Sequence, residues 1–257
     1  MSFYVRTVCD RRSMKDFLRL PFTIYRGDPN WVPPILSEVR RTLDEDRNPY
    51  FTKATLKLFV CYDGNTPVAR TGIVINPLYE KKFGVRAAFF GFFESVEDDR
   101  AVRSLLSEAE KYCRSHGVAI IEGPFNPNHY SELGLQVSGF GTPPSFFQTY
   151  NPPYYPRLLE GFGFSVSARM FTAKNEHIRE YVEKHYGTGN FLKESQGIVV
   201  RSLNLHDLEG DLERIREVFN DAFASNWHFL PSSREEYEFS TKFLRYLTEP
   251  NLIKIVE

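Results

Sequence analysis

The stretch "GFFESVEDDRAVRSLLSEAEKY", residues 91–112, predicts a strand that enters a helix through an acidic turn. The apolar residues of its second half recur every three or four positions, which is typical of an amphipathic helix packed on a sheet. Many α/β enzymes bind a phosphate at such a junction, through glycines and free N–H groups at the helix start. Here the junction carries Glu97, Asp98 and Asp99 and no glycine. The chain therefore either lacks a phosphate site or has filled this one in.

The elements around this stretch predict a mixed, largely antiparallel sheet in an α+β fold. Residues 55–76 form the clearest hairpin, because two alternating runs flank the turn sequence "DGNT". A helix is expected over 13–27, with Ser13 as N-cap, Asp16 three residues later, and a kink or break at Pro21. Other segments expected as strands are 3–8, 86–95, 118–125 and 165–174.

The order of elements restarts near Gly197 as strand, helix, helix, strand, and the last apolar run, 251–257, has no partner after it. We expect a first domain over 1–190. Residues 191–257 are then a linker and the incomplete opening part of a second domain.

Composition excludes several classes of protein. The net charge of −1, without a long Lys/Arg block, argues against nucleic acid as the main partner. The three cysteines are far apart and no Cys/His cluster has ligand spacing, so we expect a cytoplasmic protein with no metal. No signal peptide or membrane span is indicated, which leaves peripheral membrane contact open.

Several unusual phrases carry a resemblance to a known family. They include "LPFTIYRGDPNWVPPILSEVR", "NPYF", "FFGFFES", "EGPFNPN" and "YNPPYY". With these phrases the chain resembles the YghO-type proteins, a family that includes bacterial ceramide synthases. The order of its elements resembles the GNAT acyltransferase fold, and the tail resembles the start of a second copy. The resemblance implies that the full-length protein transfers an acyl group from acyl-CoA, its co-substrate, to an amine. A long-chain sphingoid-type amine is one acceptor it implies.

The resemblance also gives the acidic turn a meaning. Active GNAT domains carry Q/R-x-x-G-x-G/A at this turn, where backbone N–H groups hold the pyrophosphate of coenzyme A. "SVEDDRAV" has no glycine there, and acidic side chains stabilise a helix N-terminus themselves. We therefore expect a structural turn. The cofactor-binding residues of the first domain stay unknown. The resemblance implies that the loop for the pyrophosphate of coenzyme A lies in the second domain.

Glu94 is the candidate catalytic residue, because GNAT enzymes often keep a carboxylate at the end of this strand to deprotonate the amine. The plainer interpretation is a strand-end Glu that meets solvent or caps a neighbour. GNAT proteins also carry a tyrosine about four residues before a Gly-Phe pair, where this chain has Leu158 and Leu159. That departure argues against chemistry in the first domain.

Candidate substrate-binding residues lie in a long Gly/Pro/aromatic loop. Asn126, Asn128 and Tyr130 follow the strand 118–125, at the edge where α/β sheets tend to bind ligands. Asn151, Tyr154 and Tyr155 belong to an aromatic run that could line an acyl or lipid groove. Asn and Pro are also ordinary turn residues, and rings more often fill a core.

Two functions remain open at this point. The first is acyl-CoA-dependent N-acyl transfer onto a small-molecule or lipid-like amine, by a protein that is open to homodimer formation. The second is a degenerate, non-catalytic GNAT-like module that binds a ligand or a partner protein. An R-x-x-G-x-G loop in a second domain would favour the enzyme.

Overall fold

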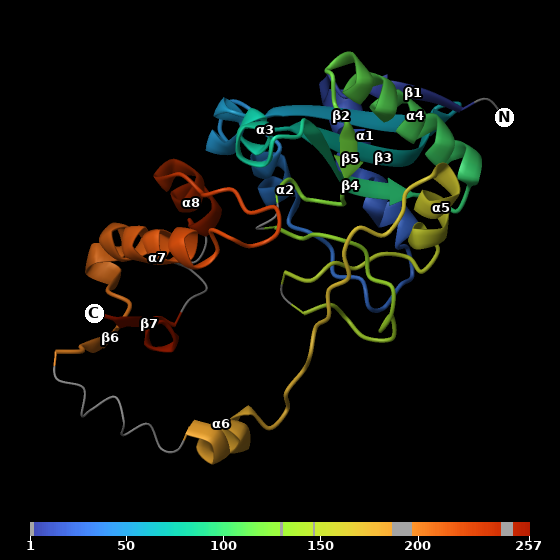
Figure 1. Cartoon of the computed structure of the whole chain (residues 1–257). Coiled ribbons are helices and arrows are strands. Elements are labelled where there is room, and N and C mark those ends of the chain that lie inside the picture. Colours follow the sequence, from blue (N-terminus) through green and yellow to red (C-terminus); the bar gives the residue numbers. More distant parts are fainter. Residues whose placement is uncertain (1–2, 129–130, 146, 187–196, 243–248) are drawn as a thin grey trace. The chain divides into compact units, whose positions relative to one another are not determined.

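The computed structural model describes residues 3–128, 131–145, 147–186, 197–242 and 249–257 (Figure 1). These fall into two compact units. The first unit comprises Met1–Ser165 together with Phe223–Pro231. The second unit comprises Val166–Ala222 together with Ser232–Glu257.

A five-stranded sheet forms the centre of the first unit, with its strands in sequence order. The first four strands pair antiparallel with one another, and the fourth and fifth strands are parallel to each other. The mixed, largely antiparallel sheet predicted from the sequence is confirmed, including the hairpin that turns between Asp63 and Thr66. The strands are β1 (Phe3–Thr7), β2 (Thr55–Asp63), β3 (Thr66–Ile75), β4 (Ala87–Ser95) and β5 (Ile120–Glu122).

Helices of the first unit build two apolar clusters on the sheet. Phe17 and Leu18 pack with Leu58 and Val60 in one cluster, whereas helices α4 and α5 pack with Phe90 and other strand residues in the second. The helical elements are α1 (Arg11–Ile24), α2 (Leu36–Thr42), the 3₁₀ turn η1 (Pro49–Thr52), α3 (Pro77–Phe83), α4 (Asp99–Ser115) and α5 (Tyr155–Phe162).

Helix α4 confirms the amphipathic helix that was predicted from the apolar residues in the second half of residues 91–112. Its buried residues include Val102, Leu105, Leu106 and Ala109. The chain leaves the helix through Gly117, whose φ of +69° lies in the left-handed region that glycine adopts without a steric cost.

The start of α1 differs from the prediction. Asp10 is the N-cap, and its carboxylate accepts the Ser13 backbone N–H while the Ser13 hydroxyl accepts the Asp10 N–H. Ser13 is therefore the third residue of this capping box and not its cap. Of the kink or break expected at Pro21, the break is wrong, because the helix continues through Pro21 to Ile24.

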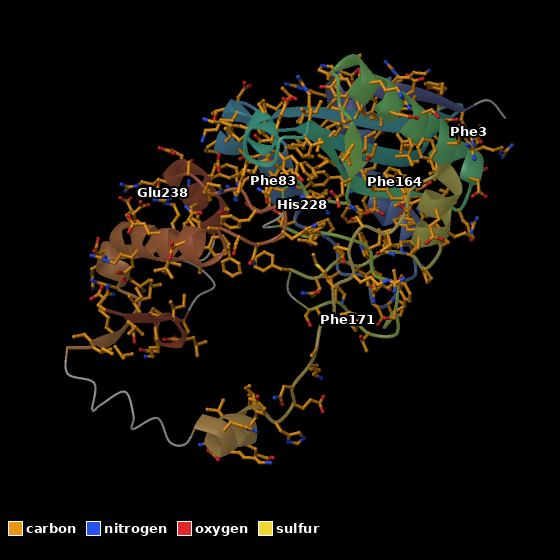
Figure 2. All side chains as sticks on the ribbon, in the orientation of Figure 1. Phe3, Phe83, Phe164, Phe171, His228 and Glu238 are labelled. Atoms are coloured by element: carbon orange, nitrogen blue, oxygen red, sulfur yellow. The ribbon has the colours of Figure 1, made fainter. Side chains whose placement is uncertain are left out.

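Two of the predicted strands differ from the structure, one because it is absent and one because it is shorter. Residues 165–174 form no strand, although their sequence alternates, and their side chains are exposed. Figure 2 shows Phe171, which is 93% exposed, on the extended chain before α6. Alternation alone does not make a strand when no partner supplies hydrogen bonds. The strand expected over 118–125 is shortened to β5, Ile120–Glu122.

In the second unit, the last strand has a partner. β7 pairs antiparallel with β6, with Val256 opposite Val200, so the expectation of an unpaired final run is corrected. That residues 191–257 open a larger GNAT-like domain stays a prediction. No helix in the described part of the chain combines the length and the hydropathy needed to cross a bilayer. The elements are α6 (Ile178–Tyr186), β6 (Val200–Ser202), η3 (Leu205–Asp207), α7 (Leu208–Ala222), α8 (Arg234–Thr241), η4 (Pro250–Leu252) and β7 (Lys254–Val256).

Candidate active site

A β-bulge near the end of β4 sets the position of Glu94. Arg70 of β3 lies opposite Glu94, and Gly72 lies opposite Gly91, so two residues of β4 face Thr71 alone. Phe92, in the bulge, has a φ of +51°, an uncommon backbone conformation for a residue with a side chain. Pairing of β4 with β5 runs from Ala87 to Phe89. Glu94 therefore lies on the part of β4 beyond that pairing.

The Glu94 carboxylate is buried in a polar network. The Tyr155 hydroxyl donates to Glu94 Oε2 at 2.6 Å and accepts the Ser95 N–H at 2.9 Å. Arg70 Nη2 lies 3.7 Å from Glu94 Oε1, and only 7% and 14% of the Arg70 and Glu94 side chains are exposed. Helix α5 thus holds the Glu94 carboxylate through Tyr155, and β3 supplies the counter-charge through Arg70.

Pro21 explains why Arg70 can be buried here. A proline has no N–H, so the carbonyl four residues before it, that of Phe17, lacks its helical donor. Arg70 Nη1 donates to that Phe17 oxygen at 2.6 Å, and the guanidinium carbon lies 4.6 Å from the centre of the Phe17 ring. Arg70 Nε has no hydrogen-bond partner among the described residues. The guanidinium is therefore held by α1 and keeps one N–H donor unused.

Burial and charge act in opposite directions on Glu94. Burial raises the pKa of Glu94, while the positive charge of Arg70 and the hydrogen bond from Tyr155 lower it, and the rise prevails. Burial lowers the pKa of Arg70 for the same reason, since the interior disfavours either charge. Burial, then the charge of Glu94, raises the pKa of the Tyr25 phenol. A carboxylate with a raised pKa is suited to accepting a proton near neutral pH.

Asn126 reaches the same bulge from the loop after β5. Its Oδ1 accepts the Phe92 N–H at 2.6 Å, and its backbone N–H donates to the Glu132 carbonyl at 3.1 Å. The loop approaches β4 so closely that a Cβ on Gly91 would lie 1.7 Å from the Phe125 carbonyl oxygen. Asn126, a predicted substrate-binding residue, thus has its side-chain oxygen engaged by the backbone.

Glu132 adds a second carboxylate to this region. Burial raises its pKa, and the Asn126 amide, whose Nδ2 lies 3.5 Å from Glu132 Oε2, partly opposes that rise. The charge of Glu132 in turn contributes to the raised pKa of Glu94.

The other predicted residues lie in different surroundings. Tyr154 donates to the Ser95 carbonyl at 2.8 Å, beside the Tyr155 bond, so both tyrosines bracket the end of β4. Asn151 bonds to both backbone groups of Gln136 and fixes the long loop. Asn128 accepts the Ser131 hydroxyl at 3.1 Å. Tyr130 lies outside the described residues.

The acidic turn before α4 is occupied by the protein's own groups. Asp98 caps the helix by accepting the Arg100 N–H at 2.9 Å, and Arg100 also pairs with that carboxylate. Arg157 of α5 lies 3.1 Å from both Glu97 and Asp99. The arrangement does not fit a pyrophosphate, since carboxylates repel it and no glycine opens the backbone.

Sequence reasoning missed Arg70, Tyr25 and Glu132. Arg70 is the one charged residue of β3, and a charge at an inward position of a central strand was an available signal. Tyr25 and Glu132 gave no comparable signal, because only the folded loops bring them towards β4.

The chain is 26% identical to Protein YghO of Escherichia coli over 98% of its length. It is 28% identical to the bacterial ceramide synthase of Caulobacter vibrioides over 93% of its length. The predicted resemblance to YghO-type proteins is confirmed. The chain spans 64% and 62% of the lengths of these two relatives, so it corresponds to less than two thirds of each.

No family model matches the chain. Among solved structures, a putative acetyl transferase from Pyrococcus furiosus is similar at a TM-score of 0.41, with 16% identity, over 68% of this chain and all of that one. The aminoglycoside acetyltransferase AAC(6')-Iy, in complex with a CoA bisubstrate analogue, has a TM-score of 0.40 and 9% identity, over 68% of this chain and 99% of that one. The fold class is α+β with a mixed, largely antiparallel sheet, as predicted, and α4 follows β4 and leads into the parallel strand β5.

Proposed function

We propose that this chain belongs to an acyl-CoA-dependent N-acyltransferase, in which Glu94 accepts a proton from the attacking amine. The observation that carries the proposal is a buried carboxylate with a raised pKa, held by Tyr155 where the pairing of β4 with β5 has ended. A long-chain sphingoid-type amine is the acceptor suggested by the relative named a ceramide synthase.

The residues of this chain would act on the amine. At neutral pH an alkyl amine is protonated and has no free lone pair, so it must lose a proton before it attacks a carbonyl. Glu94 would take that proton on Oε1 or Oε2 and become neutral, the state that its burial favours. Arg70 and Tyr155 would hold the carboxylate in place before the transfer.

When the amine attacks the thioester carbonyl, a C–N bond forms and the C–S bond breaks, and coenzyme A leaves as a thiolate that takes up the second proton lost by the nitrogen. The turn before α4 does not fit the pyrophosphate of coenzyme A. We propose that the coenzyme A moiety binds in the part of the YghO-type proteins that this chain does not match. The first unit would then contribute the amine side of the reaction.

A second candidate function is a non-catalytic GNAT-like binding module. It is favoured by Asn126, which occupies the Phe92 N–H, and by the closed acidic turn. The Phe92 N–H is then not free to bind a thioester carbonyl, and the acidic turn does not accept the pyrophosphate.

The experiment is an assay of amide formation by the full-length protein that contains this chain, from a long-chain acyl-CoA and a long-chain amine, with calorimetric titration of each ligand alongside. Glu94→Gln should lower kcat/KM for amide formation by about 10²–10⁴-fold, whereas the matched control Asp211→Asn, at a buried carboxylate of the second unit, should retain the wild-type rate. If Glu94→Gln leaves amide formation unchanged, Glu94 is not the base. If ligand binds and no amide forms with any variant or with wild type, the binding module is the better account.

A further inference from the structure

Two uncharged loops meet beside Tyr25. Residues 29–35, with the sequence "PNWVPPI", form the first loop, and residues 133–145 and 147–153 belong to the second; none of them is Asp, Glu, Lys, Arg or His. Asn30 Nδ2 donates to the Phe140 carbonyl at 3.4 Å, and the Tyr150 hydroxyl donates to Asp28 Oδ2 at 2.6 Å. Figure 1 shows the blue chain after α1 running beside the lime-green loop. The two loops form one surface of the first unit.

This surface exposes aliphatic side chains. Val32, Ile35 and Val137 are 60%, 69% and 72% exposed. Trp31, in the first loop, stacks on Tyr25 with ring centres 4.9 Å apart. Large aliphatic groups exposed on adjoining uncharged loops are unusual for a surface that only meets water, and they mark an interaction site.

Helix α1, which leads into the first loop, is basic on its outer side. Arg11, Lys15 and Arg19 are spaced four residues apart, so they lie on one face of the helix, and all three are exposed. Arg26 continues the exposed positive charge up to the loop. The one acidic residue of α1, Asp16, accepts a hydrogen bond from the Tyr62 hydroxyl at 3.1 Å. None of these four basic side chains pairs with a carboxylate among the described residues.

We infer that the loop residues 29–35, 133–145 and 147–153, together with the basic face of α1, form a docking surface for an anionic lipid bilayer. The aliphatic groups enter the boundary of the acyl chains, while Arg11, Lys15, Arg19 and Arg26 meet the anionic headgroups. Trp31 and Tyr150 are rings with polar ends, the residue type found at the membrane–water boundary. Charge complementarity selects a membrane over a second copy of the chain, because a copy would bring the same positive face.

Docking in this way would bring the bilayer to the candidate site. Tyr25 stacks on Trp31 on one side, and on the other it is close enough to Glu94 for the carboxylate to raise its pKa. An amine with a long hydrocarbon chain could then present its head to Glu94 with the chain in the bilayer. This last step rests on the proposed N-acyl transfer, whereas membrane docking does not.

The chain has two tryptophans, which makes the contact measurable. Trp227→Phe leaves Trp31 as the sole tryptophan, and Trp31→Phe leaves Trp227. Vesicles of phosphatidylcholine and phosphatidylglycerol carrying brominated acyl chains should quench the fluorescence of the Trp227→Phe protein and leave the Trp31→Phe protein unaffected. Equal quenching of both proteins, or quenching of neither, would overturn the proposal.

Binding to the same vesicles separates the two parts of the surface. Val32→Asp and Ile35→Asp should each reduce co-sedimentation at least tenfold, and Arg19→Glu should reduce it for anionic vesicles only. Val218→Asp is the matched control, since Val218 is 68% exposed on α7, and it should bind as wild type does. Self-association that Val32→Asp abolishes, without vesicle binding by wild type, would identify a second copy as the occupant and contradict the proposal.

Acylation of a short, water-soluble amine distinguishes the proposed N-acyl transfer from the proposed membrane docking, because such an amine does not need the bilayer. Val32→Asp should leave that reaction unchanged while it slows acylation of a long-chain amine held in vesicles. Glu94→Gln should lose both reactions and still bind vesicles. That outcome would support the role of Glu94 in N-acyl transfer and would show that membrane docking does not depend on the reaction.

Discussion

Two buried carboxylates, one in each unit, pair with arginine and differ in almost everything else. Asp211 in the second unit accepts two bonds from Arg201, at 2.8 and 2.7 Å, one from Arg214 and one from the Asn204 backbone N–H. These donors hold the pKa of Asp211 down at about 2. Glu94 in the first unit has one phenol at 2.6 Å and an arginine at 3.7 Å, and burial raises its pKa.

The difference lies in how fully each charge is satisfied. Asp211 has donors for both of its oxygens, so its charged form is stabilised and it holds β6 to α7. Glu94 is desolvated without enough donors to compensate, and it lies beside the Arg70 guanidinium, whose Nε–H has no acceptor in the part of the chain that the structure describes. A fully satisfied carboxylate is typical of structure, and an under-satisfied one is typical of a site that exchanges protons.

Removing Arg70 should have the largest effect on stability. Arg70→Met leaves Glu94 buried without its counter-charge and leaves the Phe17 carbonyl without a donor. We expect a loss of about 3–5 kcal/mol in the free energy of unfolding, measured by urea denaturation. The double variant Arg70→Met/Glu94→Leu should recover much of that loss. Additive losses would show that the two side chains are not coupled.

Asp211→Asn should cost less, about 2 kcal/mol, because Arg201 is partly exposed and water can replace the lost acceptor. The pH dependence has a definite sign. With a folded pKa of about 2 below the ordinary 3.8, Asp211 contributes stability that is full above pH 3.8 and is lost as the pH falls towards 2. Denaturation curves of wild type should therefore converge on those of Asp211→Asn in acid. A constant gap across this range would contradict the paired state of Asp211.

Tyr155→Phe should destabilise by about 1–2 kcal/mol, because it leaves the buried Ser95 N–H without an acceptor. Tyr154→Phe is the matched control, since its hydroxyl donates to the Ser95 carbonyl and the residue is only half-buried. Thermal unfolding should rank the Tyr155 variant below the Tyr154 variant. The reverse order would place the more important contact on Tyr154.

Changing Arg157 should have the smallest effect. Arg157→Ala removes two ion pairs to Glu97 and Asp99, but all three side chains are more than half exposed, and such pairs contribute little. We expect no measurable change in the urea midpoint and no gain of coenzyme A binding by calorimetry. Micromolar coenzyme A binding that depends on residues 97–100 would move the pyrophosphate site into the first unit.

The sequence predicted those parts of the fold that have a local signal. The hairpin around Asp63 follows from its turn residues and from the alternation of apolar residues in the two strands. Helix α4 follows from the helical spacing of its apolar residues, and Asp98 could be assigned as its N-cap because it directly precedes them. Glu94 could be proposed from its place at a strand end. Arg70 could not be assigned to it, because their pairing depends on the bulge register and on the carbonyl that Pro21 leaves free.

The pH dependence of amide formation tests the role of Glu94 most directly. If Glu94 is the base, kcat/KM should rise with pH through an apparent pKa above the ordinary 4.5 of a glutamate, because burial raises it. Tyr155→Phe should move that rise to higher pH, since the Tyr155 hydrogen bond lowers the pKa of Glu94. Glu94→Gln should remove the rise and lower kcat/KM by about 10²–10⁴-fold. A Glu94→Gln protein that is folded and keeps both the rate and the rise with pH would contradict the account.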